Sequence, residues 1–303
     1  MIEILIHTSQ FVVTLFIGYF CKEIGLLTQD DGKVLSTIIL NLTLPAVLIA
    51  GLNGAALTRI IFVMILFGLA ANLFAVLIGQ WLYRKENSTN KAFMMLTQGG
   101  YNIGNFVIPF VQGFLPQAVP LLVGFDIGNA LMMFGGRPLM VDLATQQEGH
   151  SLSGRQVARK LLTSPAFVVY LFMLPLMGLG WELPQAVMNS VNMFASANAF
   201  LAMFMLGLFL NFNFPKESIA TIRRILIAKY AVGFIFAGIV YFILPLSMTV
   251  KLTLMILAIS PVATASTIHM IDYKVTPAAS SFLSSLSILI SLVFITVILI
   301  LFV

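Results

Sequence analysis

The residues of this sequence best suited to holding a solute are amides that stand beside helix-breaking residues in an apolar stretch. Positions 97–110 read TQGGYNIGNFVIPF and include Asn102, Asn105 and Pro109. Gly costs a helix about 1 kcal/mol, and Pro about 3 kcal/mol, relative to Ala. Asn side chains offer donors and acceptors that can orient a carboxylate or hold an ion. They can also cap the broken backbone, and the two roles are compatible.

A second apolar stretch, 258–270, has the same character and reads AISPVATASTIHM. Backbone groups that are freed inside a membrane must bind protein or face a water-filled cavity. We expect Pro109 and Pro261 to fix the two breaks, because Pro removes a donor and disrupts the preceding turn; a simple kink is the alternative. Thr264 and Ser266 are expected either to line a site or to act as small packing residues.

Ionisable residues within apolar segments are candidates for coupling transport to an ion or a proton. Asp126 lies in VGFDIGNALM, and Asn129 follows one turn later on the same helical face. A carboxylate at the bilayer centre costs about 2.5–3.5 kcal/mol, which favours a functional role; a hydrogen bond to the first break is the alternative. His269 can titrate near neutral pH, although a lone His near a helix end is more often an interface residue.

Two basic residues also fall in or near apolar segments. Lys229 is expected either to face a substrate carboxylate or to extend to the cytoplasmic interface along its apolar stem. Arg137 is close to the helical face of Asp126 but is expected near the cytoplasmic surface.

Composition places all these residues in a polytopic membrane protein. Of the 303 residues, 60% are hydrophobic and 9% are charged, whereas soluble domains average about 25% charged residues. About 20 apolar residues cross a bilayer as a helix. By that measure we predict ten spans, at 5–22, 34–52, 60–83, 92–113, 117–140, 163–180, 187–210, 219–244, 250–270 and 276–303.

Other classes of protein are disfavoured by the sequence. It has no nucleotide-binding loop, no HExxH and no Gly-x-Ser-x-Gly, so no enzyme and no organic cofactor is expected. Cys21 is the only cysteine, which excludes an intrachain disulfide and a cysteine-based metal site. The net charge of +5 follows from membrane orientation and does not indicate nucleic-acid binding.

The basic residues predict that orientation. With the N-terminus outside, the outer loops hold only Arg59 and Lys251, and Arg137 and Lys229 fall in or near spans. The cytoplasmic ends and loops hold twelve, namely Lys22, Lys33, Arg84, Lys85, Lys91, Arg155, Arg159, Lys160, Lys216, Arg223, Arg224 and Lys274. This positive-inside bias predicts that both termini lie outside.

The longest polar stretch, 142–161, is predicted to be a cytoplasmic linker between two halves, 1–141 and 162–303. Each half has five predicted spans. Because five is odd, the second half enters the membrane from the opposite side, and halves that share a fold form an inverted repeat. The two broken stretches then occupy the fourth and ninth spans. Broken helices in corresponding positions of two repeats indicate the binding site of a transporter.

Four motifs, taken in order, resemble the auxin efflux carrier family, including its bacterial permease-type members. They are NLTLPAVLIAGL at 41–52, YNIGN followed by VIP at 101–109, FLAMFMLGLFL at 200–210, and SPVATAS at 260–266 followed by DYK and Pro277. The resemblance covers essentially the whole chain. The middle linker is short, as in bacterial members, and Ser266 stands where plant members often have a second proline.

The resemblance implies an all-α fold of ten transmembrane helices in two inverted five-helix repeats. Spans 1, 2, 6 and 7 would form a scaffold, and spans 3–5 and 8–10 a transport unit. Spans 4 and 9 would cross beside the substrate near the membrane centre. Some members of the family are dimers, so a homodimer is expected as a partner state.

We therefore predict a secondary transporter in a bacterial inner membrane that moves a small organic anion, such as a carboxylate or dicarboxylate, by alternating access. The predicted substrate residues are Asn102, Asn105, Pro109, Pro261, Thr264 and Ser266. Asp126, Asn129 and His269 are the candidates for coupling. The alternatives are a symporter of the bile-acid-transporter type coupled to Na⁺ or H⁺, a channel, and a membrane-embedded sensor.

Overall fold

The computed structural model describes residues 2–146 and 152–302, and every regular element in these ranges is helical. Part of the predicted linker, 147–151, lies outside the described residues. In chain order the helices are α1 (Ile2–Glu23), α2 (Gln29–Ile38), α3 (Leu44–Leu52), α4 (Arg59–Leu82), α5 (Ser88–Gln98), α6 (Ile108–Val111), α7 (Val119–Leu131), α8 (Arg137–Thr145), α9 (Gly154–Leu162), α10 (Pro165–Leu179), α11 (Gln185–Phe209), α12 (Ile219–Phe242), α13 (Met248–Ala258), α14 (Thr264–Asp272) and α15 (Pro277–Phe302).

Short turns of other helix types join some of these elements. A π-helical turn at Ile39–Thr43 connects α2 to α3, and another at Met132–Gly136 connects α7 to α8. A third, at Ile103–Val107, leads into α6. A 3-10 turn at Pro116–Ala118 leads into α7.

Seven helical segments in the described part of the chain are long and apolar enough to cross a membrane, so this is an integral membrane protein. They coincide with the first, second, third, fifth, seventh, eighth and tenth predicted spans. The sixth contains α10, which is bent by 77° from α9, and this pair would make an eighth crossing. The fourth and ninth predicted spans contain no continuous helix of membrane length.

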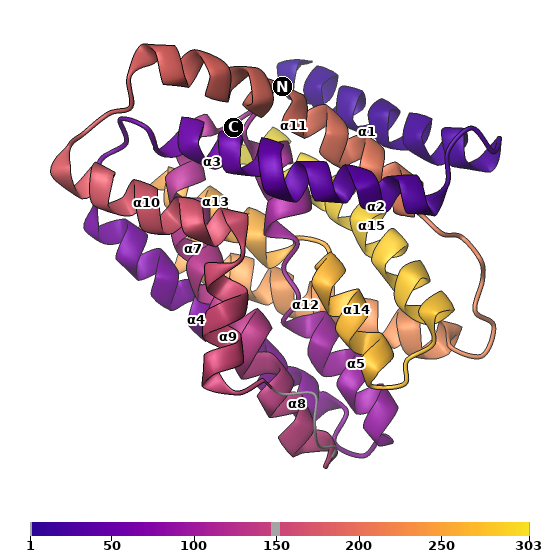
Figure 1. Cartoon of the computed structure of the whole chain (residues 1–303). Coiled ribbons are helices and arrows are strands. Elements are labelled where there is room, and N and C mark those ends of the chain that lie inside the picture. The colour runs from indigo at the N-terminus through magenta and orange to yellow at the C-terminus, as the bar shows by residue number, and fades with distance from the viewer. Residues whose placement is uncertain (1, 147–151, 303) are drawn as a thin grey trace.

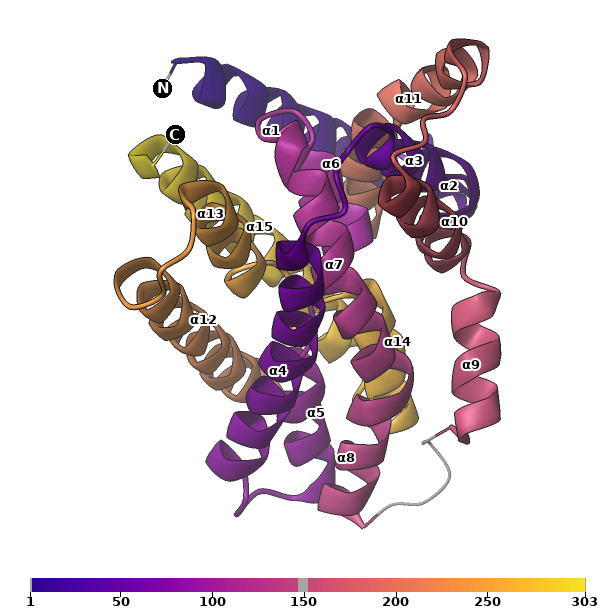
Figure 2. The same ribbon diagram turned by 90° about the vertical axis from the view of Figure 1, so that its left-hand side faces the viewer.

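The helices pack in two groups, which can be followed in Figures 1 and 2. The first, called the α11 group below, consists of α1, α2, α3, α10 and α11. The second, the α4 group, consists of α4, α5, α7, α8, α12, α13, α14 and α15. Most helix–helix contacts lie within a group, and α3 on α7 and α1 on α15 are among the contacts between them.

The first predicted break is present, but Pro109 does not make it. Helix α5 ends at Gln98, and the chain is unwound from Gly99 to Asn102 before it coils again at Ile103. Pro109 lies further along, in a helical run that passes from the π-helical turn Ile103–Val107 directly into α6. The expectation that Pro109 fixes the break is therefore wrong, and the pair Gly99 and Gly100 marks it.

The second break lies between α13 and α14, from Ile259 to Ala263, and Pro261 stands within it as predicted. Ser266 does not mark the break, because the helix has already resumed at Thr264. Freed backbone groups here are bonded to protein: the N–H of Val262 donates to Ser287 Oγ on α15 at 3.1 Å. In an apolar surrounding without water, freed backbone groups need hydrogen bonds of this kind to the protein.

The start of α1 and the end of α15 lie at the same end of the molecule in Figures 1 and 2, while the end of α8 and the start of α9 lie at the opposite end. Near the end of α8, Asn90 and Arg224 donate hydrogen bonds to Glu86 at 3.2 and 3.1 Å. These bonds lower the pKa of the Glu86 carboxyl below its usual value, and the bond from Asn90 has the larger effect. They join the start of α5 to α12.

Candidate functional site

The two breaks touch each other in the interior. The backbone N–H of Asn102 donates a hydrogen bond to the carbonyl oxygen of Pro261 at 3.1 Å. Gly100 makes this approach sterically feasible, since a Cβ atom there would lie 2.7 Å from Ser266 Oγ. Two unwound segments that are far apart in sequence therefore form one polar region inside an apolar bundle.

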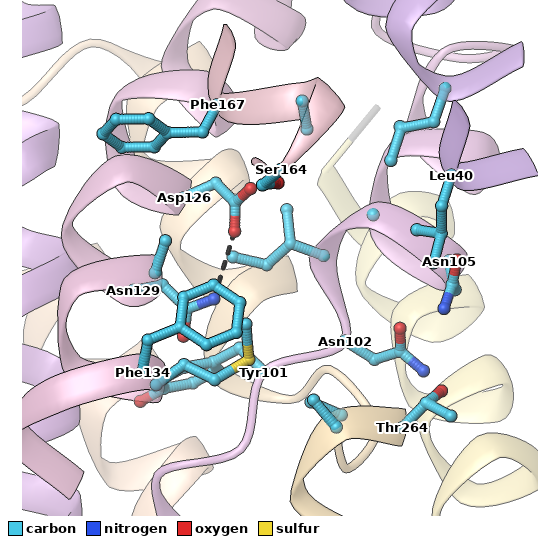
Figure 3. A pocket seen from close by; sticks show the side chains of 18 of the residues that line it. Leu40, Tyr101, Asn102, Asn105, Asp126, Asn129, Phe134, Ser164, Phe167 and Thr264 are labelled. Atoms are coloured by element: carbon cyan, nitrogen blue, oxygen red, sulfur yellow. Dashed lines mark hydrogen bonds between the residues drawn. The ribbon is translucent and has the colours of Figure 1, made fainter. Parts of the chain in front are cut away.

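A cavity of about 330 Å³ opens beside this contact (Figure 3). The first break and the π-helical turn after it contribute Tyr101, Asn102 and Asn105 to its wall, and the α4 group contributes Asp126, Asn129 and Thr264, together with apolar neighbours. The α11 group contributes Ser36, Leu40 and Leu44, as well as Ser164 to Phe167 and Tyr170 at the start of α10. The cavity thus lies between the two groups, and its volume is at the lower end of the range for small-molecule sites.

Asn102 and Asn105 present polar atoms without a partner to this region. Their side chains are only 4% and 9% exposed. The Nδ2 atom of Asn102 and the Oδ1 atom of Asn105 have no hydrogen-bond partner among the described residues. A buried polar atom left unpaired costs about 1–3 kcal/mol. These two amides can recover that cost by binding a polar solute.

Asp126 and Asn129 lie across the cavity from Asn102 and Thr264 (Figure 3). The Asn129 amide donates to Asp126 Oδ1 at 3.1 Å, and the hydroxyl of Tyr170 donates to Asp126 Oδ2 at 2.8 Å. Because Tyr170 belongs to α10, the second bond joins the two helix groups. Asp126 is thus both a wall of the cavity and a contact between the groups.

Arg137, expected at the cytoplasmic surface, is instead fully buried, with 0% of its side chain exposed. Its guanidinium donates to Ser266 Oγ at 2.8 Å and to Asn72 Oδ1 at 2.6 Å. Asn72 is itself completely buried in α4. The expected position is wrong because the residue starts α8 in the bundle interior, after the π-helical turn that follows α7.

These contacts form a continuous chain of hydrogen bonds. Asn72 Nδ2 donates to Asn129 Oδ1 at 3.2 Å, and Asn129 in turn donates to Asp126. The chain therefore runs from Ser266 beside the breaks, through Arg137 and the two amides, to Asp126 and Tyr170. One buried cation and one carboxylate are joined by two neutral amides, without direct contact between the charges.

Lys229 lies in the same interior and does not reach the cytoplasmic interface. Its side chain is 3% exposed, and its ammonium lies 3.4 Å from the carbonyl oxygen of Gly100. It also lies 5.7 Å from the ring centre of Tyr101, which lines the cavity. Of the two roles expected from the sequence, extension to the interface is wrong.

Of the nine residues chosen from the sequence, five line the cavity: Asn102, Asn105, Thr264, Asp126 and Asn129. Pro261 contributes its carbonyl to the contact between the breaks, and Ser266 faces Arg137 and Gly100. Pro109 is buried in α6. His269 is half-buried in α14, and its Nδ1 has no partner among the described residues. None of these four belongs to the cavity wall.

Two partners in the chain of bonds, Asn72 and Tyr170, were not singled out in the sequence. Asn72 could have been identified from the sequence, because it is a polar residue within the apolar span segment GLAANLFAV. Tyr170 gave no such signal, because aromatic residues are ordinary in a membrane helix. Within the described residues, no cluster of three or more His, Cys, Asp or Glu could hold a metal ion.

Comparison with known proteins indicates a membrane transporter. One curated relative, an uncharacterized transporter of Methanothermobacter thermautotrophicus, is 24% identical over 215 residues, covering 69% of this chain and 68% of the relative. A family model described as membrane transport protein matches residues 4–299, which is nearly the whole sequence. The chain therefore belongs to this family of transporters, that of the auxin efflux carriers.

Proposed function

We propose that this protein is a secondary carrier that moves a small organic anion, a carboxylate or dicarboxylate, by alternating access. The observation that carries the proposal is the cavity of about 330 Å³ between the two helix groups, bordered by both unwound segments. A site at the meeting point of two broken helices is typical of secondary transporters. Its size suits a metabolite and leaves no room for a large lipid or peptide.

Three features favour an anion. The unpaired amide nitrogen of Asn102 can donate a hydrogen bond to a carboxylate. The cavity also borders Ala263, which caps the start of α14, and the first two residues of that helix, and a helix N-terminus attracts negative charge. Finally, two buried basic side chains, Arg137 and Lys229, lie near the breaks, against one carboxylate, Asp126.

Alternating access would come from movement of the α4 group against the α11 group. The α11 group contains the first, second, sixth and seventh predicted spans and would be the scaffold, and the α4 group, with both breaks, would be the transport unit. This division supports an arrangement of ten crossings in two inverted repeats. Movement would break contacts such as that of Tyr170 with Asp126 and expose the cavity to each side in turn.

A second candidate is symport of the anion with H⁺ or Na⁺, and the position of Asp126 favours it. A carboxylate in the cavity wall repels an anionic substrate, and a bound proton or cation removes that repulsion. Thr264 and Asn102, which line the same cavity, would then complete an ion site. His269 lies outside the wall and is the weaker coupling candidate.

The test is uptake of labelled mono- and dicarboxylates into proteoliposomes containing the purified protein. Saturable uptake of one class, lost in Asn102→Ala and Asn105→Ala although both variants insert normally, is the expected result. Normal uptake by these variants would refute the site. Dissipating the pH and sodium gradients in turn distinguishes uniport from symport, and currents far above carrier turnover in a bilayer recording would indicate a channel.

Orientation can be tested separately. We propose that both termini lie outside the bacterial inner membrane and that the α8–α9 connection is cytoplasmic. A reporter that is active only in the cytoplasm should be inactive when fused to the C-terminus and active when inserted in the connection. The opposite pattern would invert the orientation but leave the site unchanged.

A further inference from the structure

The carbonyl oxygen of Gly100, freed by the first break, is held by the ammonium of Lys229. The two atoms are 3.4 Å apart, at the long end of a hydrogen bond, and both lie in the buried interior. The same ammonium lies over the ring of Tyr101, 5.7 Å from its centre. A carbonyl dipole and an aromatic face are both surfaces that attract a cation.

A second cation faces the neighbouring residue of the break. A Cβ atom on Gly99 would lie 3.1 Å from Nε of Arg137, so the guanidinium packs directly against that glycine. Within the described part of the chain, no carboxylate lies within 4 Å of either cation. The unwound pair Gly99 and Gly100 is therefore flanked by two resident positive charges that are balanced by dipoles rather than by ion pairs.

In transporters with broken helices, carbonyl groups of unwound segments commonly coordinate the coupling Na⁺. Here a side chain already supplies a positive charge at such a carbonyl. We propose that Lys229, with Arg137 beside it, is a resident substitute for a coupling cation, so that this carrier assembles its site without Na⁺. The inference rests on the proposed carrier function and decides between its two coupling ions: Na⁺ is not required, and H⁺ on Asp126 remains available.

Removal of Lys229 should then create a site for a small free cation. The Lys229→Ala variant leaves the Gly100 carbonyl without its partner. It also vacates a volume beside the Tyr101 ring that methylammonium or Na⁺ can enter. The Lys229→Met variant removes the same charge, but its side chain fills most of the space. Rescue by a free cation is expected for Ala and not for Met.

Lys251 provides a matched control on α13. Its ammonium donates to the carbonyl oxygen of Tyr241 at 2.8 Å and lies 5.6 Å from the centre of that ring. The local geometry resembles that of Lys229, but neither Lys251 nor Tyr241 belongs to a break or to the cavity wall. Lys251→Ala should therefore show no cation rescue.

The experiment measures the melting temperature of purified protein in detergent, without substrate, in sodium, methylammonium or choline chloride at equal ionic strength. The unmodified protein should melt at the same temperature in all three salts. Lys229→Ala should melt lower in choline and regain roughly 2–4 °C in saturating methylammonium or Na⁺, because a ligand of the native state alone stabilises it.

Specific stabilisation of the unmodified protein by Na⁺ would overturn the proposal, as would equal behaviour of Lys229→Ala and Lys229→Met in all salts. If Lys229→Ala is recovered only from cells or buffers containing methylammonium, that recovery supports the proposal, and the unmodified protein still supplies the sodium test. These readouts need no substrate, so they can fail while anion uptake succeeds, or succeed while uptake fails.

Discussion

The backbone N–H of Asn102 donates to the carbonyl oxygen of Pro261 at 3.1 Å, which joins the first unwound segment to the second. A hydrogen bond between two freed backbone groups satisfies both in an environment without water. It also makes the two breaks mechanically dependent, because a shift of α14 displaces the backbone that carries Asn102 and Asn105. Substitutions on one break should therefore change binding at the other.

Gly100→Ala tests this dependence. The added Cβ would lie 2.7 Å from Ser266 Oγ and 3.1 Å from the Leu96 carbonyl oxygen. Overpacking of this kind costs about 1–3 kcal/mol, so we expect a lower melting temperature and weaker anion binding. Combining it with Ser266→Ala removes the closest atom and should restore part of the loss.

The comparison needs the Ser266→Ala single variant as well, since Ser266 also accepts a hydrogen bond from Arg137. Gly238→Ala is the control, because no atom lies within 4 Å of the position its Cβ would take on α12. Additive effects of Gly100→Ala and Ser266→Ala in the double variant would show that the two breaks are independent.

Asn102→Asp tests the sign of the substrate's charge. The two side chains are similar in size, but the new carboxylate would repel an anion in the cavity, where the effective dielectric constant is well below that of water. We expect it to lower the affinity for the transported carboxylate by more than about tenfold relative to Asn102→Ala. Equilibrium binding to purified protein is the measurement.

The control is Asn189→Asp, an exposed position on α11. Tighter binding of the solute by Asn102→Asp than by Asn102→Ala would show that the carrier recognises a cation or a neutral molecule. That outcome would leave the proposed location of the site unchanged but would rule out an anion as the substrate.

The sequence predicted the helical class, seven of the spans and the two breaks, because hydropathy and helix-breaking residues are local properties. Five of the nine chosen site residues line the cavity for the same reason: amides, hydroxyls and carboxylates are costly in apolar segments, and so they stand out. The expectation for Pro109 was wrong because a membrane helix can contain Pro without unwinding, and here the helical run continues from Ile103 through Pro109.

The expected position of Arg137 was wrong for a different reason. Its distance along the chain from Asp126 placed it near a cytoplasmic end, but the π-helical turn Met132–Gly136 and the contacts with Asn72 and Ser266 hold it inside. Those partners come from α4 and α14, which are remote in sequence. A buried cation without an adjacent carboxylate can be recognised only when such remote dipoles are placed around it.

Tyr170→Phe should loosen the contact between the helix groups. The hydroxyl donates to Asp126 Oδ2 at 2.8 Å from α10 to α7. A hydrogen bond to a charged group contributes about 1.5–3 kcal/mol, so its loss should shift the populations of the two access states roughly ten- to hundredfold. The cavity should then be open more often.

Accessibility to a thiol reagent measures that shift. Since Cys21 is the only native cysteine, Cys21→Ala gives a background in which Ser164→Cys reports on the cavity wall alone. Labelling of Cys at that position should be faster with Tyr170→Phe and unchanged with Tyr241→Phe, since Tyr241 lies near the end of α12 and is not part of the cavity wall. Unchanged labelling with Tyr170→Phe would exclude the contact as a restraint on opening.

Asn72→Asp should stabilise the protein and impair transport. Asn72 Oδ1 accepts a hydrogen bond from Arg137 at 2.6 Å, and a carboxylate there would form a buried ion pair in place of the neutral contact. The same substitution removes the amide nitrogen that donates to Asn129 Oδ1, so the chain of bonds to Asp126 is interrupted. We expect a higher melting temperature, together with uptake that no longer responds to pH as it does in the unmodified protein.

Asn72→Leu, which leaves the guanidinium with one partner fewer, should instead lower the melting temperature by an amount corresponding to about 1–3 kcal/mol. An Asn72→Asp protein that keeps the unmodified pH profile would show that Arg137 and Asp126 act independently, and the amides between them would then only fill the interior.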